Sequence, residues 1–102
     1  MKTKEYLQFH RDCCDKMIAI SEAKNHDYAG FSDDDPFANF RMCESLNITS
    51  VEKGILTRMC DKMSRISNLL NKDRAVEEET IEDTLLDLAN YAIILRNYLL
   101  SE

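Results

Sequence analysis

The chain has 102 residues, and 13 lysines and arginines against 19 aspartates and glutamates give it a formal net charge of −6. This length suits one domain, and the acidic balance argues against a surface that wraps a nucleic-acid polymer. Two glycines and one proline are too few for the turns of a many-stranded β fold. We therefore expect one small, mostly helical domain over residues 1–102.

The termini and the cysteines indicate a cytoplasmic protein. Residues 1–6 carry no apolar signal segment, and no apolar run approaches the roughly 20 residues that span a bilayer. The four cysteines lack the Cys-x-x-Cys spacing of a zinc site, and His10 before Cys13 and Cys14 has no matching second pair. The cysteines are therefore expected to be buried, reduced thiols.

The N-terminal third predicts one long helix followed by a loop. Apolar residues recur every three or four positions from Thr3 to about Lys24, namely Tyr6, Phe9, Cys13, Met17 and Ile20. Glycine, aspartate and proline are concentrated in residues 25–36, which are typical of a loop. Pro36 suits the first turn of a short helix that ends near Leu46.

Two further long helices follow. Thr49 and Glu52 have capping-box spacing, and Thr49 is expected to accept a hydrogen bond from the Glu52 amide. Helical apolar spacing then runs to about Asn71 and, after a short polar connection, over residues 76–100. Short connections favour antiparallel neighbours. The predicted fold is an all-α, antiparallel bundle of three long helices and one short helix.

Two aspartates lie on the edge of the apolar face of the last helix. Asp83 and Asp87 share one row with an asparagine, two tyrosines and an isoleucine, and Glu79 lies one turn earlier (the other members are Asn90, Tyr91, Ile94 and Tyr98). Carboxylates beside apolar residues need a partner or a cation. The row therefore predicts either ligand or catalytic carboxylates or a buried ion pair.

The preceding helix offers partners for those aspartates. One acid and three bases border its apolar stripe: Arg58, Asp61, Lys62 and Arg65. One interpretation is salt bridging between the two helices. The other is that the bases hold phosphates while Asp61 joins the aspartates around Mg²⁺, which prefers oxygen ligands.

The loop region adds weaker candidates. The loop offers Lys24, Asp27 and Tyr28, which are a weak signal by themselves because asparagine, aspartate and glycine are ordinary turn formers. Phe37 and Phe40 follow it at helical spacing, where core packing is favoured over base stacking.

Four strings of residues together resemble the nucleotide-modification-associated domain, a family common in phages and grouped near the MazG-like all-α nucleoside triphosphate pyrophosphohydrolases. They are Lys24-Asn-His-Asp-Tyr-Ala-Gly30, Asp35-Pro-Phe-Ala-Asn-Phe40, Gly54-Ile-Leu-Thr-Arg-Met-Cys-Asp-Lys-Met-Ser-Arg65 and Glu79-Thr-Ile-Glu-Asp-Thr-Leu-Leu-Asp-Leu-Ala-Asn-Tyr91. The resemblance covers roughly residues 15–98.

The resemblance implies a Mg²⁺-dependent hydrolase in which water attacks the α-phosphorus of a nucleoside triphosphate and leaves a monophosphate and pyrophosphate. Catalytic and metal-binding roles would fall to Asp61, Asp83 and Asp87, with Glu79 as a further metal ligand. Substrate-binding roles would fall to Lys24, Asp27, Tyr28, Arg58, Lys62, Arg65, Asn90 and Tyr91. The location implied is the cytoplasm, which is the host's if a phage encodes the chain.

The chain departs from the MazG-like pattern in its acids. Asp61 stands without the second acid of a Glu-x-x-Glu motif, and Thr84 occupies the position of a glutamate three residues before Asp87. Two alternatives therefore stay open. One is a non-catalytic binder that sequesters a nucleotide or a nucleotide-derived signal, as a phage counter-defence protein would. The other is a helical interaction module whose charged row only forms ion pairs.

The partners predicted are a nucleotide or nucleotide-derived small molecule and further copies of the same chain, with neither a nucleic-acid polymer nor a membrane. The row that leads from the aspartates to Ile94 and Tyr98 on so short a chain predicts helices that pack across subunits. The protein is thus expected to be a homo-oligomer.

Overall fold

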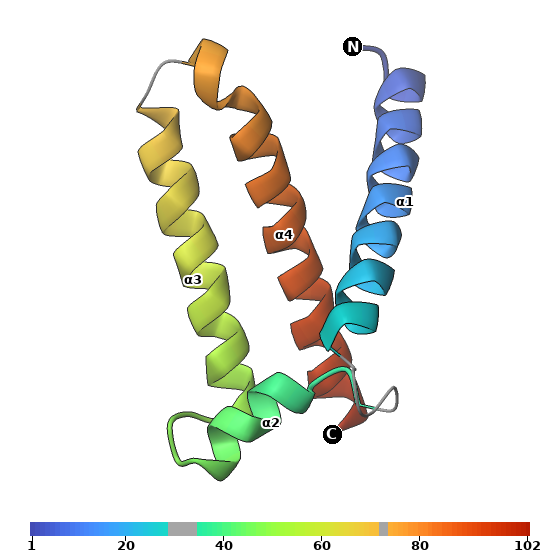
Figure 1. Cartoon of the computed structure of the whole chain (residues 1–102). Helices are drawn as coiled ribbons and strands as arrows, with labels where there is room; N and C mark the ends of the chain where they lie inside the picture. Colours follow the sequence, from blue (N-terminus) through green and yellow to red (C-terminus); the bar gives the residue numbers. More distant parts are fainter. Residues whose placement is uncertain (29–34, 72–73) are drawn as a thin grey trace. The chain divides into compact units, whose positions relative to one another are not determined.

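The computed structural model describes the backbone of residues 1–28, 35–71 and 74–102 and the side chains outside residues 25–34 and 72–80. Within these ranges it contains four helices and no strand: α1 (Thr3–Tyr28), α2 (Ala38–Ser45), α3 (Val51–Leu70) and α4 (Arg74–Ser101) (Figure 1). The all-α prediction is confirmed. Among the described residues, none of the helices is long and apolar enough to cross a membrane.

The chain divides into two compact units, Met1–Asp35 and Pro36–Glu102. In the first, α1 has Cys13, Met17 and Ile20 half-buried along the predicted stripe, whereas Tyr6 and Phe9 are exposed. The second unit holds the other three helices and the apolar core.

Three helix boundaries differ from the prediction. α1 ends at Tyr28 rather than near Lys24 because glycine is absent until Gly30 and the polar residues before it do not break a helix. α4 likewise begins earlier than predicted, at Arg74. α2 begins at Ala38, since its first backbone bond runs from the Arg41 amide to the Phe37 carbonyl, so Pro36 precedes the helix.

The N-terminus of α3 is capped one residue later than the sequence predicted. The Ser50 hydroxyl accepts a hydrogen bond from the Lys53 amide at 3.3 Å, so the Thr49 cap was wrong. The Glu44 carboxylate also accepts from the Val51 amide at 3.2 Å. Both acceptors satisfy amides that have no partner within the helix, and an acid here suits the helix dipole.

A tight turn joins α2 to α3. The Ile48 amide donates to the Cys43 carbonyl at 2.9 Å and the Asn47 amide to the Glu44 carbonyl at 3.0 Å, which is the Schellman pattern. Asn47 has a φ of 60°, the left-handed conformation that asparagine tolerates better than most residues. This turn sends the chain directly into α3.

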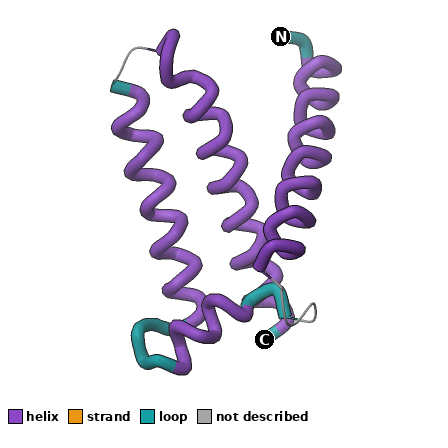
Figure 2. The backbone as a smooth tube through the Cα atoms, in the orientation of Figure 1, coloured by secondary structure: helices purple, strands orange, loops and turns teal. Residues whose placement is uncertain are grey.

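The core lies where α2, α3 and α4 meet. α3 runs antiparallel to α4, and α2 lies across their end (Figure 2). Phe37, Val51 and Ile55 are buried, and half-buried side chains of α2, α3 and α4 pack on them (Phe40, Met59, Tyr91, Ile94, Leu95 and Tyr98). The predicted core role of both phenylalanines is confirmed.

The row of α4 that ends in Ile94 and Tyr98 packs within the chain. Phe37 and Tyr98 meet edge to face, with ring centroids 5.3 Å apart and planes at 84°. The Arg41 guanidinium lies 5.9 Å from the Tyr98 ring and pairs with Glu102. α2 and α3 of the same chain cover part of this row, and its assignment to a subunit contact stays a prediction.

The four cysteines are unpaired, as predicted. Cys13 and Cys43 are half-buried, but Cys14 and Cys60 are exposed, so the expectation that all four are buried was wrong. The helical stripe explains the difference, because adjacent residues such as Cys13 and Cys14 point in directions about 100° apart on a helix.

Candidate functional site

An ion pair between α3 and α4 is the centre of the candidate site. The Lys62 ammonium lies 3.3 Å from a carboxylate oxygen of Asp87, and the two side chains are 20% and 24% exposed. The interhelical salt bridge, one of the two interpretations that the sequence allowed, is confirmed for this pair. Because water covers little of either group, the opposite charge of the other group compensates for part of the lost hydration.

Arg58 extends this cluster by one helical turn. It precedes Lys62 by four residues on α3, which places both bases on one face. The Arg58 guanidinium lies 6.0 Å from the centre of the Tyr91 ring on α4, within the range of a cation–π contact. It also lies 3.9 Å from Asp61, a pair that is more than half exposed and therefore contributes little.

Two buried polar residues of α4 flank Asp87. Thr84 is 4% exposed and Asn90 is 8% exposed. Within the described part of the chain, every buried side-chain nitrogen or oxygen has a hydrogen-bond partner. Asn90 was a predicted site residue, whereas Thr84 was noted only as a departure from an acidic motif. Its position three residues before Asp87 is the signal that places it in this site.

The predicted site residues thus divide into groups. Lys62, Arg58, Asp87 and Tyr91 meet across the two helices. Asp61, Arg65 and Asp83 are exposed, and of these Asp61 contacts Arg58. Lys24 is half-buried on α1, in the first unit. The side chains of Asp27, Tyr28 and Glu79 lie outside the described residues.

The donors for a metal ion are few in the described part of the chain. It contains no group of three or more histidines, cysteines, aspartates and glutamates placed to hold a metal. Asp87 and Asp83, one turn apart on α4, supply carboxylate oxygens. Mg²⁺ commonly binds through one or two carboxylates together with waters and substrate phosphates, so these donors fit a Mg²⁺ that arrives with phosphates.

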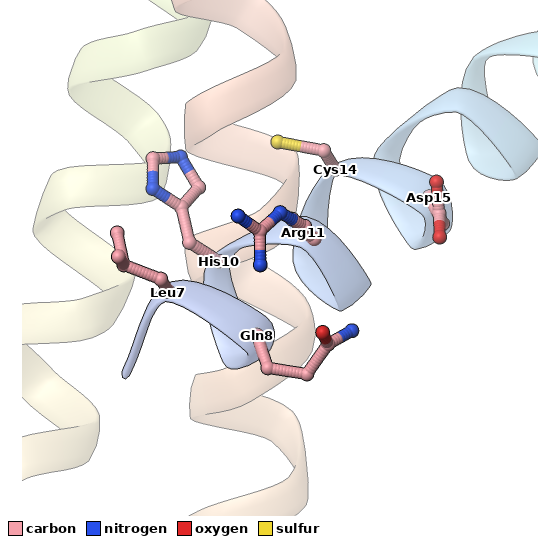
Figure 3. Close-up of a pocket in the computed structure, with 6 residues that line it drawn as sticks. All are labelled: Leu7, Gln8, His10, Arg11, Cys14 and Asp15. Carbon is pink, nitrogen blue, oxygen red and sulfur yellow. The ribbon is translucent and has the colours of Figure 1, made fainter. Parts of the chain in front are cut away.

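A second feature is a shallow hollow of about 520 Å³ on α1, lined by Leu7, Gln8, His10, Arg11, Cys14 and Asp15 (Figure 3). All six residues come from one helix, and the surface of a single helix is convex, so the hollow is a groove between neighbouring side chains. None of the predicted site residues whose side chains the structure describes lines this hollow.

One family of known proteins matches the region of the chain that contains the site residues. No curated protein and no solved structure matches the chain. The family model described as "Nucleotide modification associated domain 1" matches residues 24–96, which is most of the chain and includes every predicted site residue. The chain therefore belongs to the nucleotide modification associated domain 1 family.

Proposed function

We propose that this protein binds a nucleotide on the seam between α3 and α4, and that it hydrolyses a nucleoside triphosphate to the monophosphate and pyrophosphate with Mg²⁺. The observation that carries the binding proposal is the Lys62–Asp87 pair beside Arg58 and Tyr91. Family membership supports a nucleotide-related ligand.

The chemistry of these side chains suits a phosphorylated ligand. Arg58 presents a planar fork of donors that matches phosphate oxygens, and Lys62 adds a point charge one turn away. Tyr91 offers an aromatic face and Asn90 a side-chain amide, both able to contact a base or sugar. A net charge of −6 is compatible with such a ligand because these bases are concentrated locally on α3.

The hydrolytic step assigns different tasks to the carboxylates and the bases. Arg58 and Lys62 would hold the phosphates in place, and Asp87, with Asp83 one turn earlier, would hold a Mg²⁺ and orient the attacking water. A bound Mg²⁺ would supply charge neutralisation at the phosphates. Oligomers that contribute acids from a second copy would complete this arrangement.

A panel of nucleoside triphosphates and deoxynucleoside triphosphates, including base-modified ones, tests both parts. Binding is measured by calorimetry in the presence of Mg²⁺, and ³¹P NMR of the same samples detects pyrophosphate. We expect at least one nucleotide to bind and to release pyrophosphate. Absence of binding across the panel contradicts the whole proposal, and binding without pyrophosphate contradicts the hydrolytic part.

Matched variants test whether the nucleotide binds on the seam between α3 and α4. Arg58→Ala and Lys62→Ala should each weaken nucleotide binding about tenfold or more, as loss of a charge-assisted hydrogen bond does. Lys53→Ala removes an equal charge from an exposed position on α3 and should leave affinity unchanged. Equal affinities for all three variants would place the ligand elsewhere.

A second candidate function is a binder that sequesters a nucleotide or nucleotide-derived signal without cleaving it. The engagement of Asp87 by Lys62 favours it, because a carboxylate held by an ammonium does not act as a base or metal ligand in that state. Recovery of intact nucleotide after prolonged incubation with the protein and Mg²⁺ distinguishes this candidate from the hydrolase.

A further inference from the structure

The Lys62–Asp87 ion pair affects how well an anion or a cation can bind alone in the site. Its 3.3 Å separation and low exposure mean that a cation reaching Asp87 competes with the Lys62 ammonium. An anion reaching Lys62 likewise competes with the Asp87 carboxylate. Either ion alone separates the pair and deprives one partly buried group of the opposite charge that lies 3.3 Å away, which is unfavourable.

The arrangement changes when an anion and a cation enter together. A phosphate then takes Lys62 while a divalent cation takes Asp87, so that every charge regains a partner of opposite sign. Arg58 lies on the same face of α3 as Lys62 and is more than half exposed, so a chain of phosphates on Lys62 also comes within its reach. Asp61 opposes this only weakly because its pair with Arg58 is exposed.

We propose that Lys62 and Asp87 form an exchange pair that makes the binding of phosphate and of a divalent cation mutually dependent. The inference rests on the proposed nucleotide site and adds a rule for its occupation: neither ion binds well alone, and each raises the affinity for the other by the same factor. Lys62 is thereby both a phosphate-binding residue and the group that keeps Asp87 from binding cations without substrate.

Removing one member of the pair should release the other to bind its ion alone. Mn²⁺ serves as a paramagnetic substitute for Mg²⁺, and its binding without any phosphate is measured by electron paramagnetic resonance. We expect Lys62→Met to bind Mn²⁺ at least tenfold more tightly than the wild type. Lys53→Met, which removes an exposed charge from the same helix, controls for the change in net charge. Adding Asp87→Asn to Lys62→Met should abolish the gain.

The converse variant tests the anion side. With a chelator present to remove metals, Asp87→Asn should bind inorganic pyrophosphate at least tenfold more tightly than the wild type in calorimetry. Glu82→Gln, which neutralises an exposed acid on α4, is the matched control. Circular dichroism verifies that each variant is folded, and the two arms use different variants, so either one can report if the other variant unfolds.

The outcomes separate the exchange from the proposed function. Lys62→Met and Asp87→Asn affinities that do not exceed those of Lys53→Met and Glu82→Gln overturn the exchange, even if nucleotides bind to the wild type. Gains in the two variants without binding of any nucleotide in the panel support the exchange and contradict the nucleotide function.

Discussion

Gly54 shows how one residue sets the approach of two helices. A Cβ atom at this position would lie 3.3 Å from both Phe40 Cδ1 and Thr49 Cγ2, which is tighter than ordinary van der Waals contact. α2 and the turn after it can therefore pack closely on α3 only because the side chain is absent. In a helix this glycine has an entropic cost, which the close packing offsets.

A branched side chain at Gly54 should accordingly destabilise the fold. We expect Gly54→Val to lower the free energy of unfolding by about 1–3 kcal/mol through overpacking. Thermal unfolding followed by circular dichroism measures this change. Ser64→Val, at an exposed position of α3, is the control and should change stability little. A Gly54→Val variant as stable as the wild type would contradict the close approach.

Tyr98 is a single residue that makes the stability of the fold depend on pH. Burial, followed by repulsion from Glu52, Glu44 and Glu102, raises the pKa of Tyr98 above its ordinary value of 10.0, and Arg41 partly opposes the shift. The folded-state pKa is thus above the unfolded one. Its contribution to stability is complete below about pH 10 and is lost as the pH rises through the raised pKa.

Replacing this hydroxyl should therefore flatten the alkaline decline in stability. We expect the melting temperature of Tyr98→Phe to fall less than that of the wild type between pH 9 and pH 12. Subtracting the phenolate absorbance of Tyr98→Phe from that of the wild type at each pH gives the titration of Tyr98 alone. The midpoint of this titration should lie above pH 10. A midpoint at or below 10 would show that Tyr98 is not shielded by the core.

At the scale of elements, α3 has one face that carries the core and one that does not. Ile55 is completely buried, whereas its neighbour Leu56 is 47% exposed. The sequence predicted this helix up to about Asn71 because its apolar residues recur at helical spacing. The spacing did not distinguish the two faces, since Leu56, Met63 and Leu70 are also apolar and lie seven residues apart.

The two neighbours provide a matched pair of truncations. Ile55→Ala leaves a cavity in the core and should cost about 2–5 kcal/mol of unfolding free energy. At protein concentrations low enough to keep the chain monomeric, Leu56→Ala should cost less than about 1 kcal/mol, because Leu56 is 47% exposed within the chain. Denaturant unfolding of both variants under these conditions measures the difference. Similar losses would contradict the exposure of Leu56 in the single chain.

At the scale of the whole molecule, the exposed apolar residues of α3 suggest a partner surface. Met63 and Leu70 are 59% and 51% exposed and continue the seven-residue spacing of Leu56, which is typical of a helix-packing seam. We expect two or more copies of the chain to associate through the surface formed by Leu56, Met63 and Leu70. Light scattering coupled to gel filtration should give a mass that is a multiple of 11.8 kDa.

A charge introduced among Leu56, Met63 and Leu70 tests whether the chain associates through this surface. Met63→Glu should shift the mass towards that of one chain, because it places a carboxylate in an apolar contact. Ser64→Glu introduces the same charge at the adjacent exposed position and should leave the mass unchanged. A wild-type mass of one chain would contradict the predicted oligomer.

The sequence by itself determined the number and approximate extent of the helices, because apolar spacing and the positions of glycine and proline are local signals. It also identified the bases of α3 and the acids of α4 as the polar edge of the bundle. Only the tertiary structure decided that Lys62 pairs with Asp87, that Asp61 and Asp83 face solvent, and that Ile94 and Tyr98 pack inside the chain. Periodicity gives the direction of a side chain around its own helix. Which neighbour it meets depends on the register and rotation between helices, and these are set by packing around Phe37, Gly54 and Ile55.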